Sequence, residues 1–296
     1  MSNLDAGYPR TWGRLVRDRA YRVMSVIALL FVIAPAGWLI VGVVIRAVPN
    51  WKWNVLTTLS QGTSGGLENA ILGTLVLMVG VTIIAGTVGI LTGIQLSELS
   101  RIRRNGKSSG GLLRTATEVL SGFPSIVLGY VGYIALCVGL HWGFSLLPAL
   151  LVLSLMVTPY IAKSTETALR QVPTNYREGA EALGMSTGYA LRHVVLKTAL
   201  PGIVTGLLIA LSIAGGETAP LLYTAGVTNN LPTISLVHKP IAYLTYYIWT
   251  DFNQPSNAAH IVSYDAALIL IVMVMLLLVS SRIIVVRFQR HSESRR

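Results

Sequence analysis

Long stretches without a charged residue constrain this chain more than any other feature. No Asp, Glu, Lys or Arg lies between Glu68 and Glu98, and none occurs from Val119 to Ala162. Crossing the hydrocarbon core of a membrane takes about 20 apolar residues in a helix. Only 12% of the residues are charged, about half the share that is usual in soluble domains. The sequence therefore predicts that lipid covers much of this protein.

The charge-free stretches predict six transmembrane helices. The stretch from Val119 to Ala162 is long enough for two helices, and we divide it at His141-Trp142-Gly143. Small residues at helical spacing, such as Gly89 with Gly93 and Gly202 with Gly206, predict close helix packing in lipid. We expect an all-α integral membrane protein whose spans cover about residues 23–45, 69–96, 119–140, 144–162, 198–224 and 261–281, with external segments at 47–66 and 226–260.

Basic residues predict the orientation of these spans. The net charge is +11, and among the Lys and Arg residues only Arg46, Lys52 and Lys239 lie outside four clusters that separate the spans. This is the positive-inside pattern of cytoplasmic loops. With six spans, both termini are expected in the cytoplasm, and the first apolar run lacks the cleavage site of a removable signal peptide. We predict three parts: a cytoplasmic tail at 1–22, a transmembrane domain at 23–287 and a cytoplasmic tail at 288–296.

A predicted cytoplasmic segment reads QVPTNYREGAEALG from Gln171 to Gly184. Asn175 with Glu178 has the spacing of a capping box, and Gly184 suits the left-handed position after a helix. Tyr176, Ala180 and Leu183 are predicted to share one face, and Arg177 to pair with Glu181 at i, i+4. The residues alone leave open an ordinary surface helix or a docking helix.

The fifth span contains Gly216-Glu217-Thr218-Ala219-Pro220, although an ionisable residue is costly inside a membrane. Paired glycines favour a break, Glu217 or Thr218 can cap a new half-helix, and Pro220 suits its first turn. Such a broken helix can present N–H groups to an anion, or it can be a structural kink. Pro124 and Ser125 interrupt the third span in the same way, and they either line a pathway or form a packing kink.

The cytoplasmic segment resembles the EAA loop of ABC importer permeases. The shared residues are Glu178-Gly179-Ala180, Gly184 and Val194-x-Leu196; Gly179 replaces an Ala, and Lys197 stands where many members have Pro. The resemblance implies a type I ABC importer permease fold with a cytoplasmic coupling helix that docks on an ATPase subunit. The residues it assigns to that contact are Tyr176, Arg177, Glu178, Gly179, Ala180, Glu181, Ala182, Leu183 and Gly184.

The run GETAPLL from Gly216 to Leu222, together with PSIVxG from Pro124 to Gly129, closely resembles the A-type permeases of the phosphate-specific (Pst) transport system. The resemblance implies ATP-driven import of inorganic phosphate by alternating access through a bacterial or archaeal cell (inner) membrane. It implies as partners a sister permease, a homodimeric ATP-binding subunit and an extracytoplasmic phosphate-binding protein. The residues we assign to the translocation pathway on this basis are Pro124, Ser125, Gly216, Glu217, Thr218 and Pro220.

Members of that family can carry an Arg four residues before the Glu of this motif, but this chain has Ile213 there. A buried carboxylate without a counter-charge is a poor anion site. Three solutions remain open: Glu217 is protonated, a partner subunit supplies the cation, or the anion binds backbone N–H groups elsewhere. We favour the partner subunit.

Other functions are predicted to be absent. Gly106-Lys107-Ser108 lacks the leading glycine and strand of a P-loop, so ATP and Mg are expected on the partner ATPase and no cofactor on this chain. The histidines lack metal-ligand spacing, no catalytic constellation is present, and Cys137 is the single cysteine. The alternatives are a permease for sulfate, molybdate or another oxyanion, the sister phosphate permease, and an ion-coupled secondary transporter in which Glu217 and Asp265 carry protons.

Overall fold

The computed structural model describes residues 12–62, 65–102, 109–233 and 235–293. The predicted basic loop Gly106-Lys107-Ser108 and the ends of both predicted tails, residues 1–11 and 294–296, lie outside them. In the described part, five helices are long and apolar enough to cross a membrane, and a bent pair of helices makes a sixth candidate. The chain divides into two units, residues 1–50 and 51–296.

The first unit is helix α1, Trp12–Ala47, followed by a short 3-10 turn, Val48–Asn50. Its 36 residues make a helix of about 54 Å, well over the roughly 30 Å of a hydrocarbon core. The helix therefore begins within the segment predicted as an N-terminal tail. Asn50 closes its other end by donating from Nδ2 to the carbonyl of Arg46 at 3.3 Å.

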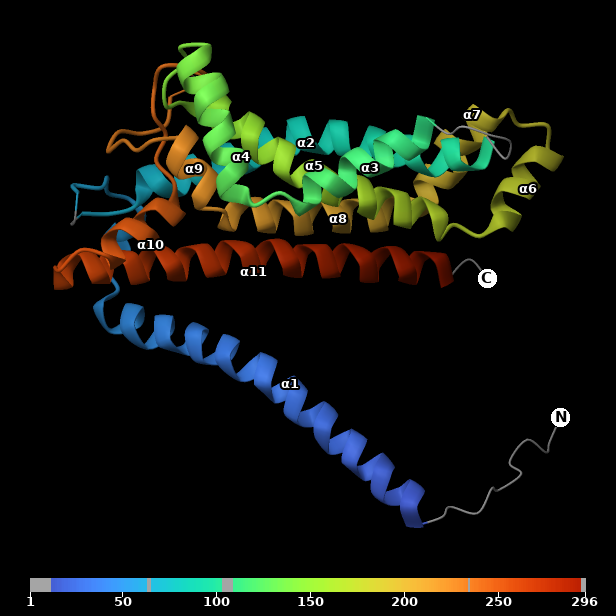
Figure 1. The fold of residues 1–296 in the computed structure, drawn as a ribbon, viewed down its shortest axis with the longest axis horizontal. Coiled ribbons are helices and arrows are strands. Elements are labelled where there is room, and N and C mark those ends of the chain that lie inside the picture. Colours follow the sequence, from blue (N-terminus) through green and yellow to red (C-terminus); the bar gives the residue numbers. More distant parts are fainter. Residues whose placement is uncertain (1–11, 63–64, 103–108, 234, 294–296) are drawn as a thin grey trace. The chain divides into compact units, whose positions relative to one another are not determined.

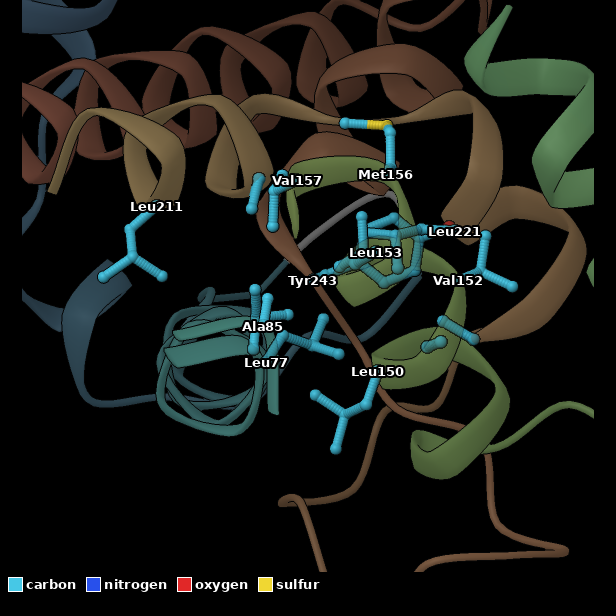
Figure 2. Close-up of a cluster of buried hydrophobic side chains, with 14 of the residues drawn as sticks. Leu77, Ala85, Leu150, Val152, Leu153, Met156, Val157, Leu211, Leu221 and Tyr243 are labelled. Atoms are coloured by element: carbon cyan, nitrogen blue, oxygen red, sulfur yellow. The ribbon is translucent and has the colours of Figure 1, made fainter. Parts of the chain in front are cut away.

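Four long helices run side by side in the second unit (Figure 1). Helix α5 is the most buried of them, and its apolar side chains pack with those of α2 and α8 in the cluster of Figure 2, which includes Leu77, Leu153, Val157 and Leu211. The four helices are α2, Glu68–Ile102; α5, Leu146–Arg170; α8, Leu196–Gly216; and α11, Asn257–Glu293.

Glycines let α2 and α8 approach α5 closely, as their spacing predicts. A Cβ atom on Gly89 would lie 2.7 Å from the Cβ of Ile161, and one on Gly93 would lie 2.5 Å from the Cβ of Thr165. On an adjacent face of α5, Gly202 faces Ala168 and Gly206 faces Ser164 at similarly short range. Close packing at both glycine pairs is therefore confirmed.

The third span is broken. Helix α3, Ser109–Gly122, is followed after Phe123-Pro124 by α4, Ser125–Gly132, which continues as a π-helix, Tyr133–Gly139. The two parts are bent by 99°. The interruption at Pro124 is thus confirmed, but the helix starts at Ser109 rather than near Val119. Charge-free length set that boundary wrongly at Glu118, because the helix includes both Glu118, which is exposed, and Arg114, which is ion-paired with Glu166.

The fifth span is broken as well. Helix α8 ends at Gly216, and a short helix α9, Ala219–Thr224, begins after Glu217 and Thr218. The helical run starts at Thr187, before the predicted boundary, through α7, Thr187–Ala190, and a π-helical stretch, Leu191–Val195. Two short helices lie between the spans: α6, Thr174–Ala182, and α10, Leu244–Phe252.

Candidate functional site

The two breaks meet where α4 packs against α9. A Cβ atom on Gly129 of α4 would lie 2.5 Å from the Cα of Pro220, the second residue of α9. Tyr130, the residue after Gly129, and Tyr223, three residues after Pro220, make an edge-to-face ring contact with centroids 5.9 Å apart. Glycine in α4 and proline at the start of α9 thus bring two segments that are about 90 residues apart into direct backbone contact.

Glu217 lies at the centre of this junction. The hydroxyl of Ser125, at the start of α4, lies beside its carboxylate as a neutral donor. Its backbone carbonyl accepts a bond of 2.8 Å from the hydroxyl of Thr245 on α10. The side chain is half-buried, and no ion pair reaches it from any residue that the structure describes. The carboxylate therefore has a neutral hydroxyl beside it and no ion-paired cation among the residues that the structure describes.

The other residues assigned to the pathway surround this contact. Pro124 and Gly216 are exposed, Thr218 is half-buried and Pro220 is buried. Pro220 lies in the first turn of α9, as predicted, whereas Thr218 at the helix N-cap forms no side-chain bond to the helix. The expected cap is confirmed in position, because Thr218 is the N-cap residue of α9, but the expected side-chain bond is not formed.

A small cavity lies beside the break. It has a volume of about 10 Å³ and is lined by residues that include Met78, Gly215, Tyr243 and Thr245. That volume suits one water molecule at most. Ser125 and Glu217 are half-buried and Gly216 is exposed, and none of the three lines this cavity.

The segment predicted to be cytoplasmic contains α6. Gly184 adopts a φ of +73°, and the amides of Gly184 and Met185 donate to the carbonyls of Glu181 and Ala180 at 2.9 and 3.1 Å. This is a Schellman motif, so the predicted glycine end is confirmed. The capping box is wrong, because the helix starts at Thr174 with Pro173 as its N-cap, and Asn175 lies inside the first turn.

Most of α6 faces away from the bundle. Within α6, all of which the structure describes, Ala180 is the one buried residue at 4% exposure. The side chains of Tyr176 and Leu183 project outward at 50% and 78% exposure, and Glu178, Gly179, Glu181 and Ala182 are exposed as well. The predicted common face is thus divided. Ala180 is buried against the rest of the chain, while Tyr176 and Leu183 are exposed.

Arg177 does not pair with Glu181. Its Nη1 lies 2.9 and 3.2 Å from the two carboxylate oxygens of Glu98 on α2. Both side chains are largely buried, at 11% and 12% exposure. A tertiary partner in a less solvated place outcompetes the i, i+4 partner, which is exposed to solvent.

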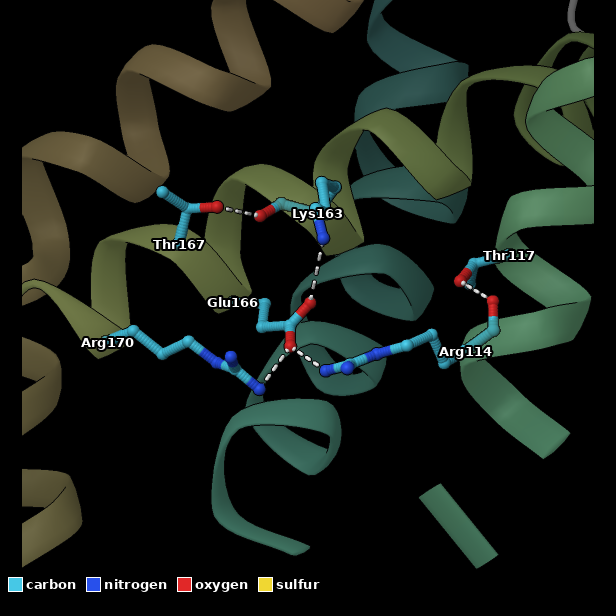
Figure 3. A network of polar contacts seen from close by, with 6 residues as sticks. All are labelled: Arg114, Thr117, Lys163, Glu166, Thr167 and Arg170. Atoms are coloured by element: carbon cyan, nitrogen blue, oxygen red, sulfur yellow. Dashed lines mark hydrogen bonds and ion pairs between the residues drawn. The ribbon is translucent and has the colours of Figure 1, made fainter. Parts of the chain in front are cut away.

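The sequence analysis missed a buried carboxylate on α5. Glu166 is 2% exposed and is surrounded by three cations, Arg114 of α3 and Lys163 and Arg170 of its own helix (Figure 3). The spacing of Lys163, Glu166 and Arg170 at i, i+3 and i+4 was the available signal. The cluster was interpreted only as positive-inside charge. No group of three or more His, Cys, Asp or Glu side chains in the described ranges is arranged to hold a metal ion.

Comparisons with known proteins match this arrangement. The family model of the binding-protein-dependent transport system inner membrane component matches residues 85–294. A phosphate transport system permease protein, PstA 2, of Mycobacterium bovis is 58% identical over 271 residues, which cover 92% of this chain and 88% of that protein. A probable phosphate transport system permease protein PstA of Methanocaldococcus jannaschii is 31% identical over 273 residues, 91% of this chain and 94% of that protein.

Among solved structures, a chain of the inward-facing MetNI methionine ABC transporter superposes with a TM-score of 0.56 at 22% identity. The match covers 74% of this chain and 94% of that chain. At this level of identity the likeness concerns the fold.

Proposed function

Because the chain belongs to the binding-protein-dependent transport system inner membrane component family, in its branch of phosphate transport permeases, we propose that it forms half of the membrane pathway of an ATP-driven phosphate importer. The observation that carries this proposal is the junction of two broken helices at Ser125 and Glu217, both of which are only half-buried in the single subunit. A second permease subunit seated there would enclose them.

The pathway residues in this proposal are Pro124, Ser125, Gly216, Glu217, Thr218 and Pro220. Phosphate is an anion, and a carboxylate near it needs a compensating cation. Ile213, one turn before the break, supplies none, and Glu217 has only a neutral partner among the described residues of its own chain. The sister permease therefore supplies the cation. Replacing Glu217 with Gln is expected to lower phosphate uptake by the assembled complex, and unchanged uptake would contradict this role.

In this proposal, helix α6 couples ATP hydrolysis in the partner subunit to transport. Tyr176, Glu178 and Leu183 form an exposed surface that docks on the homodimeric ATPase subunit, where ATP and Mg bind. The other exposed residues of this docking surface are Gly179, Glu181, Ala182 and Gly184, whereas the Arg177 and Ala180 side chains are turned toward the rest of the chain and hold the helix in place. An external binding protein delivers phosphate to the outward-open pathway. In this orientation α6 and both termini lie in the cytoplasm, as the positive-inside pattern predicts.

ATP-dependent uptake of labelled phosphate in vesicles that carry the complete complex tests the proposal. Glu178→Arg is expected to abolish both uptake and the stimulation of ATP hydrolysis by the binding protein. The matched control is Arg282→Glu, a charge reversal at an exposed position of α11. Uptake that persists in Glu178→Arg, or that follows a proton gradient without ATP, would favour the ion-coupled alternative. Competition by sulfate or molybdate would indicate another oxyanion as the substrate.

A further inference from the structure

The ion pair between Glu98 and Arg177 connects α6 to the membrane-spanning bundle. The two residues are 79 positions apart in the chain, and one guanidinium nitrogen reaches both carboxylate oxygens. Exposures of 11% and 12% leave little water around the pair. An ion pair in such a place resists separation more strongly than an exposed pair, because removing one partner leaves a buried charge uncompensated.

Apolar packing holds α6 only weakly. Its one buried side chain is the methyl group of Ala180, which contributes little burial energy. Beside the ion pair lies a groove of about 280 Å³, lined by residues that include Glu181, Thr187, Ala190 and Leu191. Helix α6 contacts the segment that follows it, α7 and the π-helical stretch Leu191–Val195, and the bond from Arg177 attaches it to α2.

Helix α2 leads from this attachment to the broken fifth span. Met78 lies on α2 about 30 Å from Glu98, at a rise of about 1.5 Å per residue. The terminal carbon of Met78 is packed so closely on Gly215 that a Cβ atom there would overlap it. Gly215 lies two residues before Glu217. One turn outward on α2, Thr74 accepts a bond of 3.0 Å from the amide of Leu244, the first residue of α10.

We propose that the Glu98–Arg177 pair is the joint through which a displacement of α6 moves α2, and through α2 the break at Glu217. A rigid helix with tight contacts at both ends is the kind of contiguous element that carries coupling between distant sites. Glu98 and Arg177 are positioning residues in this scheme, since neither touches the substrate. The inference rests on the proposed docking of α6 on an ATPase.

The test measures phosphate imported per ATP hydrolysed by the complete reconstituted transporter with its binding protein. Glu98→Gln and Arg177→Gln are each expected to lower this ratio by about tenfold, while ATP hydrolysis continues and the ATPase subunit still co-purifies. The reciprocal exchange, Glu98→Arg with Arg177→Glu, is expected to restore most of the ratio. Arg282→Gln, at an exposed position of α11, is the matched control and should leave the ratio unchanged.

The outcomes separate this inference from the proposed function. If the native complex imports no phosphate with ATP, the proposed function fails. If the native complex imports phosphate and both single variants keep its ratio of phosphate to ATP, the joint is wrong and the function stands. Loss of ATPase co-purification in the single variants would also contradict the proposal. The ion pair would then be needed for α6 to bind the ATPase, and not for the transmission of movement to α2. Failure of the reciprocal exchange to raise the ratio above that of the single variants would contradict a role for the charge pair itself.

Discussion

The hydroxyl of Ser125 lies beside the carboxylate of Glu217, and this one contact connects the breaks of two different spans. Ser125 begins α4 after Pro124, and Glu217 follows the last residue of α8. Each break exposes polar groups that a continuous helix would have satisfied internally. The contact therefore fixes the position of Glu217 where the pathway is proposed to run.

Removing this hydroxyl is expected to impair transport more than assembly. Ser125→Ala leaves Glu217 without its neutral donor, and hydrogen bonds to charged groups are worth about 1.5–3 kcal/mol. We expect the initial rate of phosphate uptake to fall by about tenfold in vesicles that contain the complete complex. The control is Ser121→Ala, whose hydroxyl bonds only the carbonyl of Glu118 on its own helix. Equal rates in the two variants would contradict a role for Ser125.

Gly129→Ala tests the contact between α4 and α9. An added methyl group would meet the Cα of Pro220 at 2.5 Å, and a backbone atom cannot move aside as a flexible side chain can. We expect a loss of about 1–3 kcal/mol in the free energy of unfolding, seen as a lower midpoint in thermal unfolding of the detergent-solubilised complex. Gly122→Ala is the control, because its Cβ would meet nothing within 4 Å.

Glu166→Gln is expected to be one of the most destabilising changes in the bundle. It removes the negative charge shared by Arg114, Lys163 and Arg170, and these cations then repel one another between α3 and α5. Removing one partner of a buried ion pair costs about 3 kcal/mol of stability. Because the three cations are partly exposed to solvent, we expect a loss of at most this size. Chemical denaturation measures the change. Glu118→Gln, at an exposed position of α3, should show almost none, and a similar stability of the two variants would argue against the network.

Gly179→Ala is expected to act in the opposite direction. Gly179 lies inside α6, and a Cβ atom there would meet nothing within 4 Å. Replacing an exposed helical glycine with alanine stabilises a helix by about 0.5–1 kcal/mol. Phosphate uptake should therefore be retained and the unfolding midpoint slightly raised. A loss of uptake would mean that the ATPase packs directly against this position and leaves no room for a methyl group.

The long spans and both breaks followed from local sequence. Charge-free length located α2, α5 and α11, and Pro124 and Glu217 marked the interruptions, because these signals act within one segment. The start of α3 was misplaced for the same reason. Glu118 ends the charge-free stretch, but α3 continues past it to Arg114 and beyond, and the ion-pair partner of Arg114, 52 residues away on α5, leaves no local pattern.

The partner of Arg177 was mispredicted in a similar way. Helical spacing offered Glu181 at i+4, whereas the folded chain provides Glu98 in a less solvated place. The meeting of Ser125 with Glu217 was likewise invisible, although each residue was identified separately. Local signals find elements and interruptions, while the pairing of charges and hydroxyls depends on which helices become neighbours.

The buried carboxylate of Asp251, at the end of α10, gives a pH-dependent stability whose sign can be tested. Burial raises the pKa of Asp251 from its ordinary value of 3.8 to about 6, and Oδ2 has no hydrogen-bond partner among the described residues. The folded state therefore binds a proton more tightly than the unfolded state, so this contribution is fully present below pH 4 and is lost as the pH rises through about 6. In the native protein the unfolding midpoint is expected to fall between roughly pH 4.5 and 7.5, on either side of the raised pKa. This fall should be smaller in Asp251→Asn. An identical pH profile in the native and variant proteins would show that Asp251 does not titrate in this range.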